Sequence, residues 1–270
     1  MSTNKTVRYY NQIGSRLGYS LVAGGHRHFG YNRDKKYWYI PHAAVAMIDY
    51  LATFSEIKPG DVVLDAGCGE GRASLRIAEK FGASVTGIDV VPRSIKFATR
   101  RYKNTSADVS YLLGDYNKLP FKDGTFDVVF TLETFTHSSD PEKTLKEFWR
   151  VLKPGGRIII FDYSIKDPES VPLKYKLAIE NIASGTNCPG FIKIFHDYYD
   201  KNLPKFGMKQ FEVINQTDAV LRTLRQIYIL SWVPYKLFRM LGIVNKHPNL
   251  LISHFAYDAA EKGIWRYIKE

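Results

Sequence analysis

Short apolar runs alternate with amphipathic segments through the first 165 residues of the chain. The runs with the length and β-branched content of buried strands lie at residues 61–65, 83–89, 109–113, 126–132 and 157–161. Between them, apolar residues recur at helical spacing at residues 72–81, 92–102 and 141–152. Gly82 is expected to close the first of these helices, and Asp140 is expected to cap the N-terminus of the third. A helix is also expected at 40–54, where Pro41 suits the first turn. Strands that alternate with helices predict a parallel, doubly wound α/β sheet with helices on both faces.

The pattern loosens after residue 162. Two helices are expected before residue 206, and residues 211–215 and 263–269 alternate like a sixth and a seventh strand. Between these two strands, residues 219–241 form a long, aromatic-rich amphipathic segment in which Pro234 predicts a break. Because this connection is too long for a turn, it predicts a helical cap near the end of the chain.

Composition places the chain among ordinary globular proteins, with 45% hydrophobic and 24% charged residues in a length of 270. The formal net charge of +11 is unevenly placed, because residues 1–33 and 219–257 contain Lys and Arg but no acid. Basic ends suit an anionic partner such as a membrane surface or a phosphorylated substrate, and a solubilising surface is the alternative. Nucleic acid is not expected, since no zinc-finger, RNP or basic-zipper pattern accompanies the charge.

The chain shows no sign of a disulfide framework or a membrane anchor. Cys68 and Cys188 give neither metal-ligand spacing nor a set of paired cysteines. The first residues lack the apolar core of a signal peptide, and no uncharged apolar stretch of about 18 residues is present. A cytoplasmic protein is therefore expected, with peripheral membrane contact and homo-oligomerisation left open.

A glycine-rich loop and three aspartates mark the ends of the first three strands. The loop reads LDAGCGEG at residues 64–71, and glycines at this place let backbone amides approach a ligand at a helix N-terminus. Asp65 ends the first strand, Asp89 the second, and Asp115 follows the third. A dinucleotide site is the competing interpretation, but here the acid precedes the glycines and the loop is G-x-G-x-G. Since half-buried carboxylates need partners, the three acids predict a ligand site at this edge of the sheet.

Taken together, these residues resemble the class I S-adenosylmethionine-dependent methyltransferases. The matching segments, between roughly residues 55 and 165, are LDAGCGEG, TGID, GDYNKLPF, DGTFDVVF and LKPGGRIII. The resemblance implies a Rossmann-like core of seven mostly parallel strands, S-adenosylmethionine as cofactor, and no metal. The cofactor-binding positions that it implies are Asp65, Gly67, Cys68, Gly69, Asp89, Val90, Asp115, Tyr116 and Glu133.

Within this set, the resemblance gives each part of the cofactor its own residues. Asp65 and the loop glycines would hold the methionine end, with Cys68 as a small packing residue rather than a nucleophile. Asp89 would accept from the ribose hydroxyls and Val90 would lie against adenine. Asp115 would accept from the adenine amino group, with Tyr116 flanking the ring.

The flanks of the chain resemble the sterol and tocopherol C-methyltransferase group within that class. This resemblance implies an N-terminal arm over the cofactor (1–39), a cofactor-binding core (40–165), and the rest of the sheet with a helical substrate cap (166–270). It implies an apolar substrate such as an isoprenoid, a sterol or a prenylated ring. The predicted substrate contacts are Tyr10, His28, Tyr31, Tyr228 and Trp232.

Two features of the flanks leave alternatives open. The pair of histidines in HRHFGY (residues 26–31) has the spacing of metal ligands, but no carboxylate or third histidine accompanies it, so a metal is not expected. The cap stretch 221–244 suits a lid over the substrate, and a membrane-surface helix or a dimer face are the alternatives.

Glu133 and His137 form an E-x-x-x-H element directly after the fourth strand. The resemblance implies that Glu133 steadies a carbocation or takes its proton, because an alkene that attacks a sulfonium methyl becomes a cation. Both residues are the predicted catalytic pair, and a role in the turn or on the cofactor side of the cavity is the alternative. The leading hypothesis is C-methylation of an apolar small molecule. N- or O-methylation of an amine, alkaloid or phenol, and a cofactor-binding module without catalysis, remain as alternatives.

Overall fold

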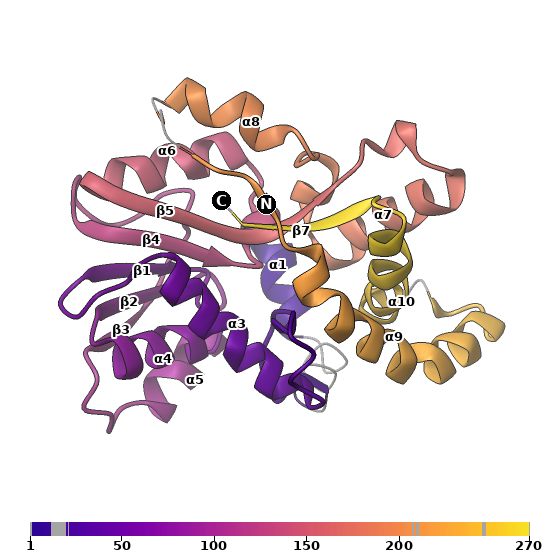
Figure 1. Ribbon diagram of the computed structural model, residues 1–270, viewed down its shortest axis with the longest axis horizontal. Helices are drawn as coiled ribbons and strands as arrows, with labels where there is room; N and C mark the ends of the chain where they lie inside the picture. Colours follow the sequence, from indigo (N-terminus) through magenta and orange to yellow (C-terminus); the bar gives the residue numbers. More distant parts are fainter. Residues whose placement is uncertain are drawn as a thin grey trace.

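The core of the protein is a seven-stranded sheet in the order β3-β2-β1-β4-β5-β7-β6 (Figure 1). The computed structural model describes residues 2–11, 20, 22–206, 208, 211–244 and 247–269. The strands are β1 Val62–Ala66, β2 Ser84–Asp89, β3 Val109–Leu113, β4 Phe126–Leu132, β5 Leu152–Ile165, β6 Ile214–Asn215 and β7 Trp265–Lys269. Strands β1 to β5 pair in parallel, and β7 pairs antiparallel with both β5 and β6. The predicted seven-stranded, mostly parallel sheet is confirmed.

Helices cover both faces of this sheet. They are α1 Ser2–Asn11, α3 Ile40–Phe54, α4 Arg72–Phe81, α5 Pro92–Arg101, α6 Pro141–Val151, α7 Leu173–Thr186, α8 Tyr198–Asn202, α9 Thr217–Met240 and α10 Pro248–Glu261. Short 3-10 turns are η1 Phe135–His137, η2 Pro168–Ser170, η3 Pro189–Ile192 and η4 Leu203–Phe206. Figure 1 shows α3, α4 and α5 on one face, α6 and α8 on the other, and α7, α9 and α10 beyond the end of the parallel strands. The predicted cap is the pair α9 and α10.

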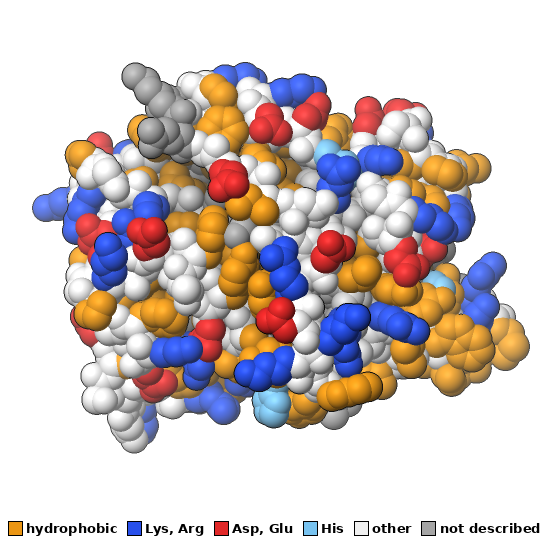
Figure 2. Space-filling model, in the orientation of Figure 1, with side chains coloured by type: hydrophobic (Ala, Val, Ile, Leu, Met, Phe, Trp, Pro, Cys, Tyr) orange, Lys and Arg blue, Asp and Glu red, His pale blue; other side chains and the backbone are white. Residues whose placement is uncertain are grey.

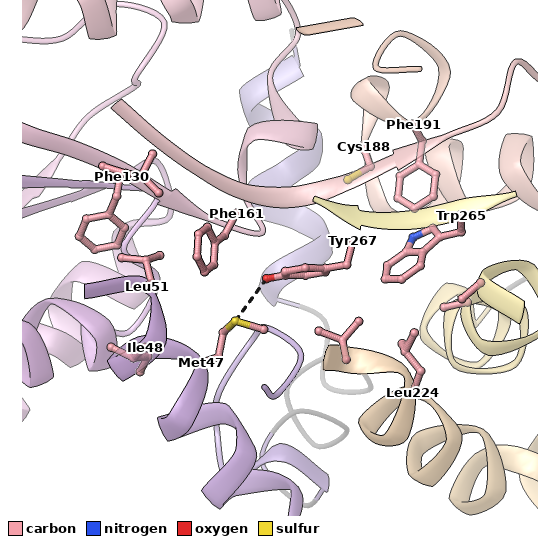
Figure 3. Close-up of a cluster of buried hydrophobic side chains, with 14 of the residues drawn as sticks. Met47, Ile48, Leu51, Phe130, Phe161, Cys188, Phe191, Leu224, Trp265 and Tyr267 are labelled. Carbon is pink, nitrogen blue, oxygen red and sulfur yellow. Dashed lines mark hydrogen bonds between the residues drawn. The ribbon is translucent and has the colours of Figure 1, made fainter. Parts of the chain in front are cut away.

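The larger of two hydrophobic cores lies between the sheet and the apolar face of α3. Figure 3 shows Met47, Ile48 and Leu51 of α3 directed towards Phe130 and Phe161 of the sheet. The same core continues into the cap, where Trp265 and Tyr267 of β7 lie near Leu224 of α9. The cap and the sheet are therefore packed as one body, which gives a cavity between them rigid walls.

Three predicted elements differ in extent from the structure. Pro234 lies inside α9, which runs unbroken from Thr217 to Met240. The carbonyl four residues before it belongs to Leu230, which is 60% exposed, so water can replace the lost helical hydrogen bond. β6 is only two residues long, and β5 begins at Leu152 because Gly155, at a φ of +79°, lets the chain pass its Pro-Gly-Gly sequence within the strand.

The N-terminus of α6 has the predicted cap, since Asp140 accepts a hydrogen bond from the Lys143 amide at 3.1 Å. We expect Asp140→Ala to lower the free energy of unfolding by about 1 kcal/mol, because the Lys143 amide in the first turn of the helix loses its acceptor. Chemical denaturation measures this, with Asp108→Ala as the control that removes the same charge from an exposed site outside a helix. Equal stability of the two variants would contradict the capping role.

Two observations bear on the basic ends of the chain. Arg16 and Lys246, which contribute to the predicted clusters of charge, lie outside the described residues. Within the described ranges, no helix has the length and hydropathy needed to traverse a bilayer.

Candidate active site

Two cavities meet at the carboxyl ends of the parallel strands. The first is lined by the loops that follow β1, β2, β3 and β4, together with residues 25–28 and part of α1. The second, of about 500 Å³, lies between the sheet and helices α7, α9 and α10, and most of its wall is apolar. The side chains that line both cavities are Tyr10, Arg27, His28, Glu133 and His137.

The glycine loop after β1 forms one wall of the first cavity. Gly67 and Gly69 have φ values of +95° and +54°, in the left-handed region that favours glycine. A Cβ atom on Gly67 would stand 2.2 Å from the Thr134 hydroxyl oxygen, so no side chain fits there. The Gly67 and Cys68 amides both donate to the carbonyl of Ile88, at 2.8 and 3.0 Å, which ties the loop to β2.

Gly67→Ala is expected to weaken cofactor binding about tenfold or more, because the new methyl group displaces either the loop or Thr134. Gly60→Ala is the matched control: Gly60 also has a positive φ, of +87°, but a Cβ there meets nothing within 4 Å. Calorimetric titration with S-adenosylmethionine compares the two variants. Equal affinity in both would show that the contact with Thr134 is unimportant.

Asp65, at the end of β1, is a buried carboxylate that lacks a cationic partner among the described residues. Its Oδ2 atom accepts a 2.6 Å hydrogen bond from the Ser74 hydroxyl. Burial raises the pKa of Asp65 to about 7. A positively charged ligand group would lower that pKa and stabilise the carboxylate, as an amino acid ammonium does.

Arg72 supplies the opposite charge on the wall of the same cavity. Its Nε atom is buried and has no hydrogen-bond partner among the described residues. A carboxylate would satisfy this donor with a charge-assisted hydrogen bond. Asp65 and Arg72 together therefore suit a zwitterionic amino acid, which is the methionine end of the expected cofactor. Sequence reasoning missed Arg72, because its position at the start of α4 gives no sign that its side chain turns into the site.

The carboxylates of Asp89 and Asp115 accept hydrogen bonds from backbone amides, and their oxygens can accept further hydrogen bonds. Asp89 accepts from the Gly69 amide at 2.9 Å and from the Val91 amide at 2.8 Å, one through each carboxylate oxygen. Partial burial raises the pKa of Asp89, and these two hydrogen bonds oppose the rise. Each oxygen keeps a second lone pair, as recognition of a vicinal diol requires. Asp115 Oδ1 accepts from the Asn117 amide at 2.8 Å and from its side chain at 2.6 Å.

The structure places all nine predicted cofactor residues on the wall of the first cavity. Tyr116 is fixed by a 2.8 Å hydrogen bond from its hydroxyl to the carbonyl of Thr134. Cys68 is buried, and burial raises the pKa of its thiol well above the usual range, which suits a packing residue and not a nucleophile. The roles of the individual residues towards the cofactor stay predictions.

Glu133 lies where the two cavities join, in a strained backbone conformation. Its φ of +54° is unusual for a residue with a side chain and costs of order 1 kcal/mol. Its amide donates to the carbonyl of Phe161 at 2.7 Å, and its Oε1 atom accepts from the Phe29 amide at 2.7 Å. The Tyr267 hydroxyl, which donates to Met47 Sδ at 3.9 Å, also interacts with the carboxyl group, and burial raises the pKa of Glu133 well above its ordinary value. The strand end thus holds a carboxyl group of high proton affinity at the junction.

His137, in η1, is a hydrogen-bonded neutral ring. Its Nε2 atom lies 2.8 Å from the Tyr10 hydroxyl, and its Nδ1 atom 3.2 Å from the carbonyl of Asn187. Desolvation lowers the pKa of His137, which favours the neutral form. With Nδ1 donating to the carbonyl, Nε2 accepts from Tyr10, so the ring connects α1 to the junction. Cys188 lies 3.4 Å from Nδ1, and burial raises the pKa of its thiol to about 12.

The predicted substrate contacts separate into two groups. Tyr10 and His28 line both cavities. Tyr31 instead stacks on Tyr50, with ring centroids 4.2 Å apart, Tyr228 stacks on His254, and Trp232 is 47% exposed. The described lining residues of neither cavity include these three, so their contact with substrate stays a prediction without support from their placement.

The apolar wall of the second cavity is built from aromatic residues that are not among the predicted substrate contacts. They are Phe29, Tyr163, Phe191, Phe238, Phe255 and Trp265. These residues come from the N-terminal segment, β5, η3, α9, α10 and β7, so only the tertiary fold brings them together.

The two histidines of the N-terminal patch form a neutral pair. His26 Nδ1 and His28 Nε2 lie 3.3 Å apart. Burial lowers the pKa of His26 to about 3 and that of His28 to about 4. Throughout the part of the chain that the structure describes, His, Cys, Asp and Glu side chains nowhere gather in threes or more in a metal-binding arrangement.

This sheet order, with a glycine loop and acids at the ends of three successive strands, defines a Rossmann-like class I methyltransferase. Residues 64–160 match the family described as a methyltransferase domain. The 2-methyl-6-phytyl-1,4-hydroquinone methyltransferase of Synechocystis is 31% identical over 78% of this chain and 68% of its own length. The chain belongs to the S-adenosylmethionine-dependent methyltransferases and uses S-adenosylmethionine as its cofactor.

Other relatives are named for different reactions. An S-adenosylmethionine-dependent Diels-Alderase of Talaromyces variabilis is 29% identical over 96% of this chain and 91% of its own. The norajmaline N-methyltransferase of Rauvolfia serpentina is 28% identical over 97% and 94%. Sequence likeness at this level therefore leaves the methylated atom open.

Solved structures share the fold over nearly the whole chain. The cyclopropane synthase of Mycobacterium tuberculosis superposes with a TM-score of 0.81 at 14% identity, over 99% of this chain and 96% of its own. A geranyl diphosphate methyltransferase superposes with a TM-score of 0.76 at 18% identity, over 99% and 97%. At such identities the likeness shows the fold alone.

Proposed function

We propose that the protein transfers a methyl group to a carbon atom of an apolar small molecule, such as an isoprenoid, a sterol or a prenylated ring. The observation that carries this proposal is the position of Glu133. This carboxyl group lies between the cofactor cavity and an apolar cavity of about 500 Å³. A cavity of this size and polarity suits a small apolar ligand, and Glu133 is the one acid among its described lining residues.

Glu133 is suited to an alkene substrate. When bound, the cofactor supplies a methyl group on a positively charged sulfur atom. An alkene carbon that takes this methyl leaves a carbocation on the substrate, and the proton on a neighbouring carbon must then be removed. A carboxylate at the junction stabilises the cation and accepts that proton, which restores a double bond. The high proton affinity that burial gives to Glu133 favours the transfer.

The surroundings of Glu133 support this role. The Phe29 amide donates to the carboxyl group from the N-terminal segment, and the Tyr267 hydroxyl interacts with it from β7. Tyr10 of α1 and His137 of η1, joined by a 2.8 Å hydrogen bond, line the junction. In this arrangement they act as a wall that positions the substrate and excludes water, and His137 is not required as a base.

N-methylation of an amine is the second candidate. The similarity to norajmaline N-methyltransferase over almost the whole chain favours it. A buried carboxylate at the junction would pair with an ammonium group and accept its proton before methyl transfer. Cyclisation without methyl transfer is a third outcome, given the Diels-Alderase relative. In that case the apolar cavity would hold a folded polyene.

A turnover screen tests these alternatives. The protein is incubated with methyl-labelled S-adenosylmethionine and, in separate reactions, with prenyl diphosphates, sterols, prenylated quinols or amines, and products are analysed by mass spectrometry. We expect label on a carbon atom of an apolar substrate. Label in amines alone would contradict C-methylation, and an isomerised product without label would identify a cyclase.

A further inference from the structure

The second half of α9 exposes an apolar stripe to solvent. Residues four or so positions apart lie on one side of a helix, and on this side the exposed fraction runs from 46% at Leu237 to 77% at Met240. The stripe consists of Ile229, Leu230, Val233, Leu237, Met240 and Leu241. Figure 2 shows hydrophobic side chains gathered at the lower right of the molecule, over the end of α9. An exposed patch of this kind marks an interaction surface.

Two exposed aromatic residues extend the stripe towards the start of α9. Trp38 is 80% exposed and Tyr39 is 60% exposed. The Gln226 side chain donates to the carbonyl of Trp38 at 2.9 Å, and the Arg222 guanidinium lies 4.6 Å from the Trp38 ring centroid. Residues 222 and 226 precede the stripe by whole helical turns, so the tryptophan continues its line. Large exposed aromatics are enriched where proteins meet the headgroup region of a bilayer.

Basic side chains flank the stripe along its length. Arg222, Arg225, Lys236 and Arg239 lie on α9, and the chain has no acid between Ala219 and Tyr257. The Lys236 ammonium lies 5.6 Å from the ring centroid of Trp232, which is itself 47% exposed. An apolar stripe with cations beside it is complementary to an anionic lipid surface, whereas two copies of it would bring like charges together.

The stripe shares a residue with the wall of the apolar cavity. Leu230, Pro234 and Phe238 line that cavity, and Leu230 also belongs to the stripe. Leu230 thus joins the wall of the cavity to the exposed apolar surface of α9.

We propose that this surface docks onto an anionic lipid bilayer, with α9 lying in the interface plane and without a membrane-crossing segment. An apolar substrate then reaches the cavity from the lipid, and this second statement rests on the proposed function. The docking itself does not, because it depends only on the stripe and its cations.

Flotation of the full chain with lipid vesicles tests the docking. We expect binding to vesicles of phosphatidylcholine with phosphatidylserine, weak binding to phosphatidylcholine alone, and loss of binding at high salt. Lys236→Glu with Arg239→Glu is expected to weaken binding about 25-fold or more, at roughly fivefold for each cation lost. Val233→Asp with Leu237→Asp is expected to weaken it roughly tenfold or more.

Leu173→Asp with Leu177→Asp is the matched control for the apolar pair. Both leucines lie four residues apart on α7 and are 66% and 48% exposed, close to the 66% and 46% of Val233 and Leu237. We expect this control to bind vesicles like the wild type. Equal binding by all variants would overturn the proposal. So would a wild-type dimer that the Val233 and Leu237 pair converts to a monomer. The vesicle assay contains no methyl acceptor, so a failure of docking is distinguishable from a failure of the proposed function, which the turnover screen tests.

Discussion

Glu133→Gln is expected to lower the turnover number about 10²–10⁴-fold, while the affinity for S-adenosylmethionine stays within about twofold of the wild type. Glutamine keeps the size of the side chain and an acceptor oxygen for the Phe29 amide. It removes the negative charge and the proton affinity, which are the properties that deprotonation of a cation needs. Single-turnover kinetics with the substrate identified by the screen measure the loss.

The pH dependence gives this prediction a second readout. Burial raises the pKa of Glu133 well above its ordinary value, so the group is protonated at low pH and must ionise to act as a base. The turnover number is therefore expected to rise with pH through that raised pKa in the wild type. The rise should be absent in the glutamine variant.

Glu56→Gln is the control for the effect of the substitution itself. Glu56 shares the left-handed backbone of Glu133, with a φ of +50°, but its side chain is exposed and lies outside both cavities. Its replacement should change neither turnover nor affinity. Full turnover by Glu133→Gln with intact cofactor binding would reduce Glu133 to a structural residue.

Asp89→Asn is expected to weaken S-adenosylmethionine binding about 10²–10⁴-fold, as estimated from two hydrogen bonds to a charged acceptor. The aspartate accepts from the Gly69 and Val91 amides at once, through different oxygens. An asparagine offers one oxygen and one NH₂ group, so one of the two amides would face another donor and the glycine loop would shift. The ribose hydroxyls would lose an ionised acceptor in the same step.

Calorimetric titration with the cofactor measures this loss, and Asp108→Asn, at an exposed aspartate, provides the comparison. Thermal denaturation without cofactor shows whether the variant is folded. A folded Asp89→Asn protein with wild-type affinity would remove Asp89 from the cofactor site.

The sequence was sufficient for features that depend on neighbours in the chain. α4 ends at Gly82 in a left-handed conformation and α6 begins at the Asp140 cap, both as predicted. The carboxyl ends of parallel strands lie at one edge, so strand order alone placed Asp65, Asp89 and Asp115 around one cavity. Each aspartate follows or ends a strand that the local sequence pattern already predicts, so no distant contact was needed to place it.

Features that depend on distant segments could not be predicted. The partners of Glu133 are the Phe29 amide and the Tyr267 hydroxyl, both more than a hundred residues from it in the chain. Neither a backbone amide nor a lone tyrosine on a strand has a pattern that links it to a particular acid. The aromatic wall of the apolar cavity could not be predicted for the same reason, although the predicted Tyr10 and His28 do line this cavity. Tyr228 and Trp232 looked suitable by composition, but the rotation of α9 points Phe238 into the cavity instead.

The insertion of β7 between β5 and β6 has a consequence for the order in which the protein assembles. Among the strands of the described residues, β6 pairs with β7 alone, and β7 pairs with β5 across about a hundred residues of chain. Closing so long a connection costs entropy that local contacts do not offset, so we expect β1 to β5 to form before β7 joins them. Pulse-labelling hydrogen exchange during refolding would detect this as later protection of the β7 amides than of the β1 amides. The glycine loop after β1 would then fold early. Glu133 would come into contact with Tyr267 only in the last step of folding, when β7 joins the sheet.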